Sequence, residues 1–341
     1  MPVLMLALAL LAFASGGCDS CNNDPARHIV DSPHGGSDAA FHDAALVDAH
    51  DPNSDILVTQ SPAGPGNGDM ATWSGVLQFS VSGDGGALVG EAGLAKTELA
   101  DPAGLAFKSA TSEIFVGNRH GNNAADGTPG SVSRYAYDQT THALTARTAI
   151  TGNGLAGVHQ IVFSPTTGEL FAANVDNAIS RFTFDAAGDP VPNGTIGTGP
   201  TRGVLVAPDG KRLYATAASG TIRQFELATG TELAAITVVA PSNPDLHFFA
   251  YRLGDVYVAG LDTQLVYRYH LEANDDLTFV ETIAAASPIG IAFSADGSEM
   301  FVTGHRTVDL IQRYTFDGTT WQPTGTQDLG SSLAGIVIVP G

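Results

Sequence analysis

From residue 55 onward the chain repeats an apolar segment, a tight polar turn and a second apolar segment. The unit reads GLAFKSATSEIFVGN from Gly104, QIVFSPTTGELFAAN from Gln160, GVLVAPDGKRLYATA from Gly203 and GIAFSADGSEMFVTG from Gly290. A variant, FFAYRLGDVYVAG, begins at Phe248 and has the glycine displaced in its turn. Short apolar runs bounded by turn residues are typical of buried β-strands. The pattern therefore predicts a repeated strand–turn–strand unit.

One apolar position serves as a common anchor for six such units. Its members, which recur about every 45 residues, are Phe107, Phe163, Val206, Phe249, Phe293 and Ile338. An alternating segment that ends in an aromatic residue stands beside each unit: VLQF at 76–79, VSRY at 132–135, ISRF at 179–182, IRQF at 222–225, VYRY at 266–269 and IQRY at 311–314. Each segment is followed by a polar turn, which indicates an outer hairpin. Repeats of this length with four strands each are typical of β-propellers.

The two ends of the repeat region complete one another. Residues 335–341 (GIVIVPG) look like a first strand without its turn, and residues 55–60 (DILVTQ) look like the missing second strand. Pairing them in one blade would close the ring and protect the strand edges. The sequence therefore predicts an all-β, six-bladed β-propeller of four-stranded blades over residues 55–341. A seven-bladed ring is the alternative, and it would need about forty further residues.

The N-terminal region reads as a leader and a linker. Residues 4–13 form an apolar run that suits a signal peptide, and 1–17 end in small residues before Cys18. This resembles the bacterial lipobox, in which the cysteine is acylated, although Ser15 stands where leucine is usual and no basic residue precedes the run. The alternative is an ordinary secretory signal that leaves Cys18 and Cys21 as a CxxC pair. Either interpretation predicts an exported protein, in the bacterial cell envelope if lipid-anchored.

Residues 18–54 contain few large apolar side chains, which predicts a flexible acidic linker. His34, His42 and His50 recur among its aspartates. They suggest either weak metal capture or a solvated spacer.

The composition narrows the class of function. Asp+Glu number 35 against 15 Lys+Arg, a net charge of −20, which argues against nucleic-acid binding. The two cysteines precede the repeats, and no nucleophile elbow, Walker loop or zinc-protease spacing occurs. We therefore expect no cofactor and no metal centre; calcium binding by Asn118, Asn174, Asp176 and Asp262 is the alternative. A closed ring also favours a monomer.

The repeats resemble the YVTN and lactonase-like β-propeller superfamily. The resemblance rests on turns such as Ala207-Pro208-Asp209-Gly210, followed by strands such as LYAT, LFAAN and MFVTG, and it covers residues 55–341. It implies a propeller, and it implies either a lactone-cleaving enzyme or a non-enzymatic binding protein. Many lactonase-like members have seven blades, so six blades here weaken the transfer of activity.

Polar residues gather at one mouth of the expected central channel. Loops that enter the first strand or leave the second strand of a blade share one face, and they carry Asn118, Arg119, His120, His159, Asp176, Arg202, His247, Asp262, His305 and Arg306. Three arginines among them predict a positive focus for a carboxylate or phosphate ligand. The channel mouth of any propeller is solvated and polar. The alternative to a ligand site is therefore that these residues form ion pairs that only fix the loops.

Two hypotheses of function follow. The first is a binding module for a protein, a glycan or a small anion at the channel face. The second is a lactonase-like hydrolase or lyase, in which His159 or His247 acts as base and Arg202 or Arg119 stabilises the oxyanion. Membrane contact is expected through the lipid anchor only.

Overall fold

The computed structural model describes residues 55–60, 75–81, 88–95, 99–119, 129–217, 219–240, 242–305, 310–328 and 333–339. The expected signal peptide (1–17) and linker (18–54) lie outside these residues. In the described part of the chain, no helix has the length and apolar character needed to cross a membrane. Its one helical element is a short 3-10 turn, η2 (Ser109–Thr111).

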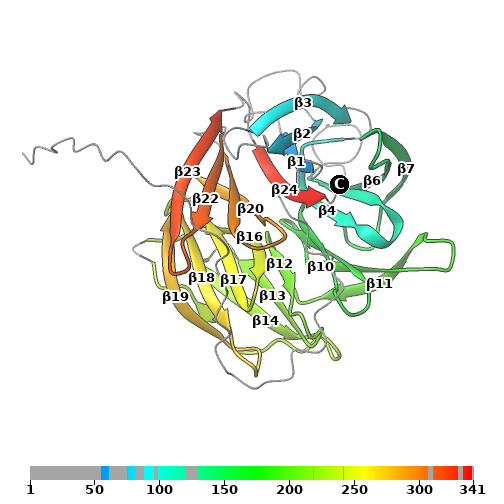
Figure 1. Cartoon of the computed structure of the whole chain (residues 1–341). Helices are drawn as coiled ribbons and strands as arrows, with labels where there is room; N and C mark the ends of the chain where they lie inside the picture. Colours follow the sequence, from blue (N-terminus) through cyan, green and yellow to red (C-terminus); the bar gives the residue numbers. More distant parts are fainter. Residues whose placement is uncertain are drawn as a thin grey trace, which may run out of the picture. The chain divides into compact units, whose positions relative to one another are not determined.

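The strands form six antiparallel sheets of four, as the repeats predicted (Figure 1). Blade one contains β24 (Leu333–Val339), β1 (Asp55–Gln60), β2 (Gly75–Val81) and β3 (Leu88–Ala95). Blade two contains β4 (Pro102–Lys108), β5 (Glu113–Asn118), β6 (Ser131–Tyr137) and β7 (Leu144–Ile150). Blade three contains β8 (Val158–Phe163), β9 (Leu170–Asn174), β10 (Ile179–Phe184) and β11 (Pro190–Ile196).

The remaining blades follow the same order. Blade four contains β12 (Val204–Val206), β13 (Arg212–Ala217), β14 (Thr221–Glu226) and β15 (Ile236–Thr237). Blade five contains β16 (Leu246–Arg252), β17 (Asp255–Gly260), β18 (Leu265–Leu271) and β19 (Leu277–Ala284). Blade six contains β20 (Pro288–Phe293), β21 (Glu299–Gly304), β22 (Leu310–Phe316) and β23 (Trp321–Asp328).

The predicted closure is confirmed. β24 pairs antiparallel with β1, with Leu57 opposite Val337 and Ile56 opposite Ile338. In Figure 1 the red β24 lies beside the blue β1. The innermost strands contact one another in the circular order β24, β4, β8, β12, β16, β20 and back to β24. The ring is therefore closed by strand pairing between the two ends of the repeat region.

The apolar core is divided into layers between blades rather than gathered in one place. Six clusters of buried side chains each join two neighbouring blades around the ring. Phe115 and Val132 of blade two, for example, pack with Phe182 of blade three. Successive residues along each strand point to opposite faces of the sheet. Every blade therefore contributes side chains to two layers, one with each neighbouring blade. Burial of these layers drives the packing of the ring.

A buried polar pair links the second and third strands of most blades. It joins an acidic residue to an arginine in four blades: Glu113 and Arg134, Glu169 and Arg181, Asp255 and Arg268, Glu299 and Arg313. In blade one, Gln78 donates to Asp55 instead, and in blade four Arg212 donates to Gln224. The two partners lie within one sheet, so these pairs fix strand register and account for most buried charges.

Each innermost strand carries a β-bulge where the chain enters the blade. Five blades show a register shift at this point, and in blade four Thr216 accepts from Arg202 N and donates to Gly203 O. The bulged pairs, in ring order, are Ala334-Gly335, Ala103-Gly104, His159-Gln160, Arg202-Gly203, His247-Phe248 and Ile289-Gly290. Bulges re-aim side chains, and they are common beside functional sites.

The second bulge residue is glycine in four blades because neighbouring strands approach closely. A Cβ atom on Gly104 would lie 2.1 Å from the carbonyl oxygen of His159, and one on Gly203 would lie 2.2 Å from that of His247. Real Cβ atoms do not come so close to backbone oxygen. Gln160 and Phe248 are the two exceptions.

One predicted anchor was wrong. In blade five the residue equivalent to Phe163 is Tyr251, not Phe249, because Tyr251 pairs with Val256 as Phe163 pairs with Leu170. The turn that follows is shorter in this blade, since Arg252 pairs directly with Asp255 across Leu253 and Gly254. With this correction, His247 holds the same bulge position as His159 and Arg202.

Candidate functional site

The first bulge residues divide the channel into two halves. Three consecutive blades contribute His159, Arg202 and His247, which we call the polar arc. The other three contribute Ala334, Ala103 and Ile289, which we call the apolar arc and which pack together in one buried cluster with Phe248. The six positions are equivalent in the repeat, so the asymmetry arises from side-chain identity and not from the backbone.

The imidazole rings of His159 and His247 form an offset stack. Their ring centroids are 5.8 Å apart with an interplanar angle of 30°. The two residues come from blades three and five, which are not neighbours, so their side chains can meet only near the ring axis. Both are buried, with 5% and 3% of their surface exposed.

Arg202 of blade four connects His247 to an aspartate. Its Nη1 donates to Asp245 Oδ1 and lies 3.0 Å from His247 Nε2. A guanidinium group can only donate, so His247 accepts through Nε2 in this contact. Asp245 Oδ2 also lies 3.5 Å from His247 Nε2. The polar arc therefore contains a compact Asp–Arg–His cluster.

Arg119 forms a second, similar pair. Its Nη2 donates to Asp101 Oδ1 at 2.6 Å, and its side chain is 30% exposed. Asp101 and Asp245 both precede an innermost strand, with φ of 54° and 46°. Aspartate tolerates this left-handed conformation better than most residues. Since each arginine has its own aspartate, the positive focus expected from the sequence is largely neutralised in the described part of the mouth.

His159 has an unusual electrostatic environment. Its pKa lies well below the ordinary value, first because burial penalises the charged imidazolium and then because the nearby Arg119, His247, Arg202 and His305 disfavour a further positive charge. No hydrogen bond within the described residues satisfies its Nδ1. His159 is therefore a neutral, buried imidazole with hydrogen-bonding capacity left over.

The other expected residues are distributed unevenly. His305 Nδ1 lies 2.9 Å from the carbonyl oxygen of Leu333, and His305 is close enough to affect the charge of His159. Asn118 is fully buried and donates to Ser133 Oγ, so it holds the blade together. Asp176 and Asp262 are exposed, one after β9 and one after β17. His120 and Arg306 lie outside the described residues.

Sequence reasoning missed Asp101 and Asp245. The only signal was positional: each stands two residues before a first bulge residue, in Asp101-Pro102-Ala103 and Asp245-Leu246-His247. Asp245 pairs with Arg202 of the preceding blade, 43 residues away, so this contact appears only once the blades are assembled, whereas Asp101 and Arg119 lie 18 residues apart and flank the first hairpin of one blade.

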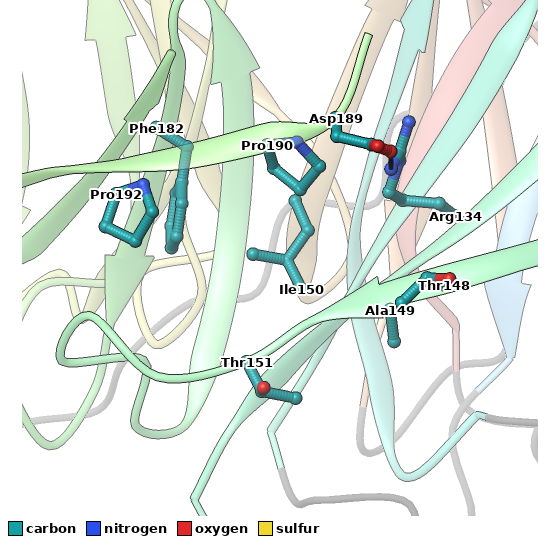
Figure 2. Close-up of a pocket in the computed structure, with 9 residues that line it drawn as sticks. All are labelled: Arg134, Thr148, Ala149, Ile150, Thr151, Phe182, Asp189, Pro190 and Pro192. Carbon is teal, nitrogen blue, oxygen red and sulfur yellow. Dashed lines mark ion pairs between the residues drawn. The ribbon is translucent and has the colours of Figure 1, made fainter. Parts of the chain in front are cut away.

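Two further features bear on ligand chemistry. Among the described residues, no group of three or more His, Cys, Asp or Glu side chains could hold a metal ion. A groove of about 350 Å³ lies between β7 and β11, lined by Phe182, Ile150, two prolines and Arg134 (Figure 2). Arg134 is already bound to Glu113 and to the Gly188 carbonyl. The groove lies between outermost strands, and none of the predicted site residues lines it.

No family model matches the chain, and no curated protein matches it either. Solved structures do. A periplasmic gluconolactonase of Pseudomonas aeruginosa, PpgL, matches with a TM-score of 0.61 at 16% identity, over 82% of this chain and 84% of that chain. A putative 6-phosphogluconolactonase of Bacteroides uniformis matches with 0.59 at 17%, over 82% and 84%. A chain of the nidogen/laminin complex matches with 0.57 at 13%, over 83% and 98%. The chain thus shares the β-propeller fold of lactonases and of binding proteins.

The burial of His159 predicts a pH-dependent stability. Its folded pKa lies below the ordinary value of about 6.5, so the unfolded chain takes up a proton that the folded chain does not. Stability should fall as the pH drops below about 6.5, by up to about 1.4 kcal/mol per pH unit from this group. Urea unfolding between pH 7.5 and 5.5 should give a shallower pH slope for His159→Gln than for wild type. Equal pH slopes for wild type and His159→Gln would contradict a lowered pKa of His159 in the folded protein.

Proposed function

We propose that this protein is an exported binding propeller that takes a small oxyanion, a carboxylate or phosphate group, at the polar arc. The main support is the side chain of Arg202. Within the described residues every hydrogen bond of its side chain uses Nη1, and the side chain is 25% exposed. Its Nε and Nη2 therefore remain as a parallel pair of donors, the geometry that binds an oxyanion in bidentate fashion.

The surroundings support this proposal. Asp245 fixes the other edge of the Arg202 guanidinium, so little side-chain entropy is lost on binding. Arg119 adds a second partly exposed guanidinium near His159. Because both arginines are matched by aspartates, binding rests on directed N–H groups in a partly desolvated site rather than on net charge.

Replacement of Arg202 tests the anion site. Isothermal titration calorimetry with inorganic phosphate and with gluconate should give saturable binding for wild type. Arg202→Lys should weaken it about tenfold or more, because an ammonium keeps the charge but loses the parallel donors. Arg223→Lys is the matched control, since Arg223 lies on the outer part of the same blade and pairs with Glu232. Equal affinities for wild type and Arg202→Lys would contradict the proposal.

A second candidate function is lactone hydrolysis at the same site. Two of the structural neighbours carry gluconolactonase names, and the uncharged His159 has an Nδ1 with no hydrogen bond among the described residues, which allows it to accept a proton as general base. Water would attack the lactone carbonyl while His159 accepts its proton. Arg202 would stabilise the oxyanion until the C–O bond of the ring breaks, and the proton would return to the alkoxide.

Hydrolysis of glucono-δ-lactone tests this function. Proton release in a pH-stat, corrected for spontaneous hydrolysis, should be faster with wild type than with His159→Ala by about 10²-fold or more, the usual contribution of a general base. A wild-type rate equal to that of buffer would exclude this substrate. A rate unchanged by His159→Ala would exclude this base.

We further propose that Cys18 is lipid-attached in a bacterial envelope. The small residues before Cys18 support this, as does the periplasmic origin named for one structural neighbour. Membrane attachment then requires no spanning segment. In cell fractionation, Cys18→Ser should move the protein from the membrane to the soluble fraction, and Cys21→Ser should not. Partitioning that is the same for wild type and Cys18→Ser would refute acylation.

A further inference from the structure

Gln160 occupies a position that is glycine in four of the six blades, and its side chain bridges three innermost strands. Its Oε1 accepts from Val204 N at 3.0 Å on β12 and from Phe249 N at 2.9 Å on β16. Its Nε2 donates to the Phe249 carbonyl at 2.6 Å. Its own backbone N–H donates to the carbonyl of Arg202 at 3.1 Å. The amide thus spans blades three, four and five.

Phe248, the other exception, fills the opposite part of the channel. It forms one buried cluster with Ala103, Ile289 and Ala334, and all four are at most 3% exposed. These residues come from blades five, two, six and one, so they can meet only near the ring axis. The Phe248 ring also lies edge-on to His159, with centroids 6.0 Å apart. Together, Gln160 and Phe248 connect all six blades at this level.

We propose that Gln160 and Phe248 form a floor that closes the channel at the polar arc, and that Gln160 is a positioning residue for the anion site. The proposal rests on the proposed oxyanion binding and deepens it. The site is then a cup with one mouth, and a ligand enters end-on with its charged group first. A small anionic head group fits such a cup, whereas a long chain cannot thread through the ring.

The positioning role follows from adjacency in the chain. Gln160 directly follows His159; Val204 and Phe249 each stand two residues after a member of the polar arc, Arg202 and His247. One amide therefore ties together the three strands that present the arc. A shift of either partner strand would change the distance between the Arg202 donors and the His159 ring.

Two substitutions at Gln160 distinguish its role in closing the channel from its role in positioning the strands of the polar arc. Gln160→Gly removes both the side-chain volume and its hydrogen bonds, and the ring accommodates glycine at the equivalent position of four other blades. Gln160→Met keeps nearly the same volume but forms none of the three side-chain hydrogen bonds. Circular dichroism checks folding, and Phe248→Leu serves as a second floor variant if Gln160→Gly does not fold.

Three measurements are needed. NMR titration of the His159 imidazole reports access of water, amide hydrogen exchange at Val204 and Phe249 reports strand fixation, and calorimetry with inorganic phosphate reports the anion site. In Gln160→Gly, or in Phe248→Leu in its place, His159 should titrate closer to an ordinary histidine. Gln160→Met should leave the His159 titration near wild type, yet speed exchange of both amides and weaken phosphate binding about tenfold.

The outcomes distinguish this proposal from the anion site itself. An unchanged His159 titration in the folded floor variant overturns the floor. Wild-type amide exchange and phosphate affinity in Gln160→Met overturn the positioning role. If wild type does not bind phosphate, the anion proposal fails for this probe, while the titration and exchange measurements still decide whether the floor exists.

Discussion

The close approach of the innermost strands is the constraint on which the rest of the structure depends. Each inner strand bulges at its entry, and the carbonyl oxygen of the next blade lies where a Cβ of Gly104 or Gly203 would be. Glycine therefore occupies most of these positions, and a larger residue is tolerated only where its side chain can turn into the channel. Gln160 and Phe248 do so, and the first bulge residue beside each of them, His159 or His247, is consequently held near the axis.

This arrangement explains how a repetitive scaffold produces a single asymmetric site. The six bulges are equivalent in backbone, but three consecutive blades supply imidazole and guanidinium groups while the others supply small or branched apolar side chains. Burying two imidazoles and the aspartates Asp101 and Asp245 costs free energy that the neighbouring apolar layers must offset. A few polar groups held beside an apolar lining are typical of ligand sites.

The fold could be predicted from the sequence because strand–turn–strand units recur with the same period and the two ends complete one blade. The equivalent positions of His159 and Arg202 followed from the same spacing, and His247 was predicted at the same mouth, but its exact position depended on the shorter turn at Leu253-Gly254. The partners Asp101 and Asp245 were not predictable, since both contacts depend on a left-handed backbone and the contact of Asp245 also joins two separate blades. Gln160 was visible in principle, as a departure from glycine once the six units are superimposed.

The hydrogen bonds of Gln160 also bear on how this ring could have evolved. Its amide reaches from β8 past β12 to Phe249 on β16, a span set by the curvature of six inner strands. Duplication of one blade, the simplest genetic route to a larger propeller, would widen the circle and draw Phe249 away from the amide. The number of blades in this protein is thus tied to the length of the Gln160 side chain. A change in that number would also require a different residue at this position.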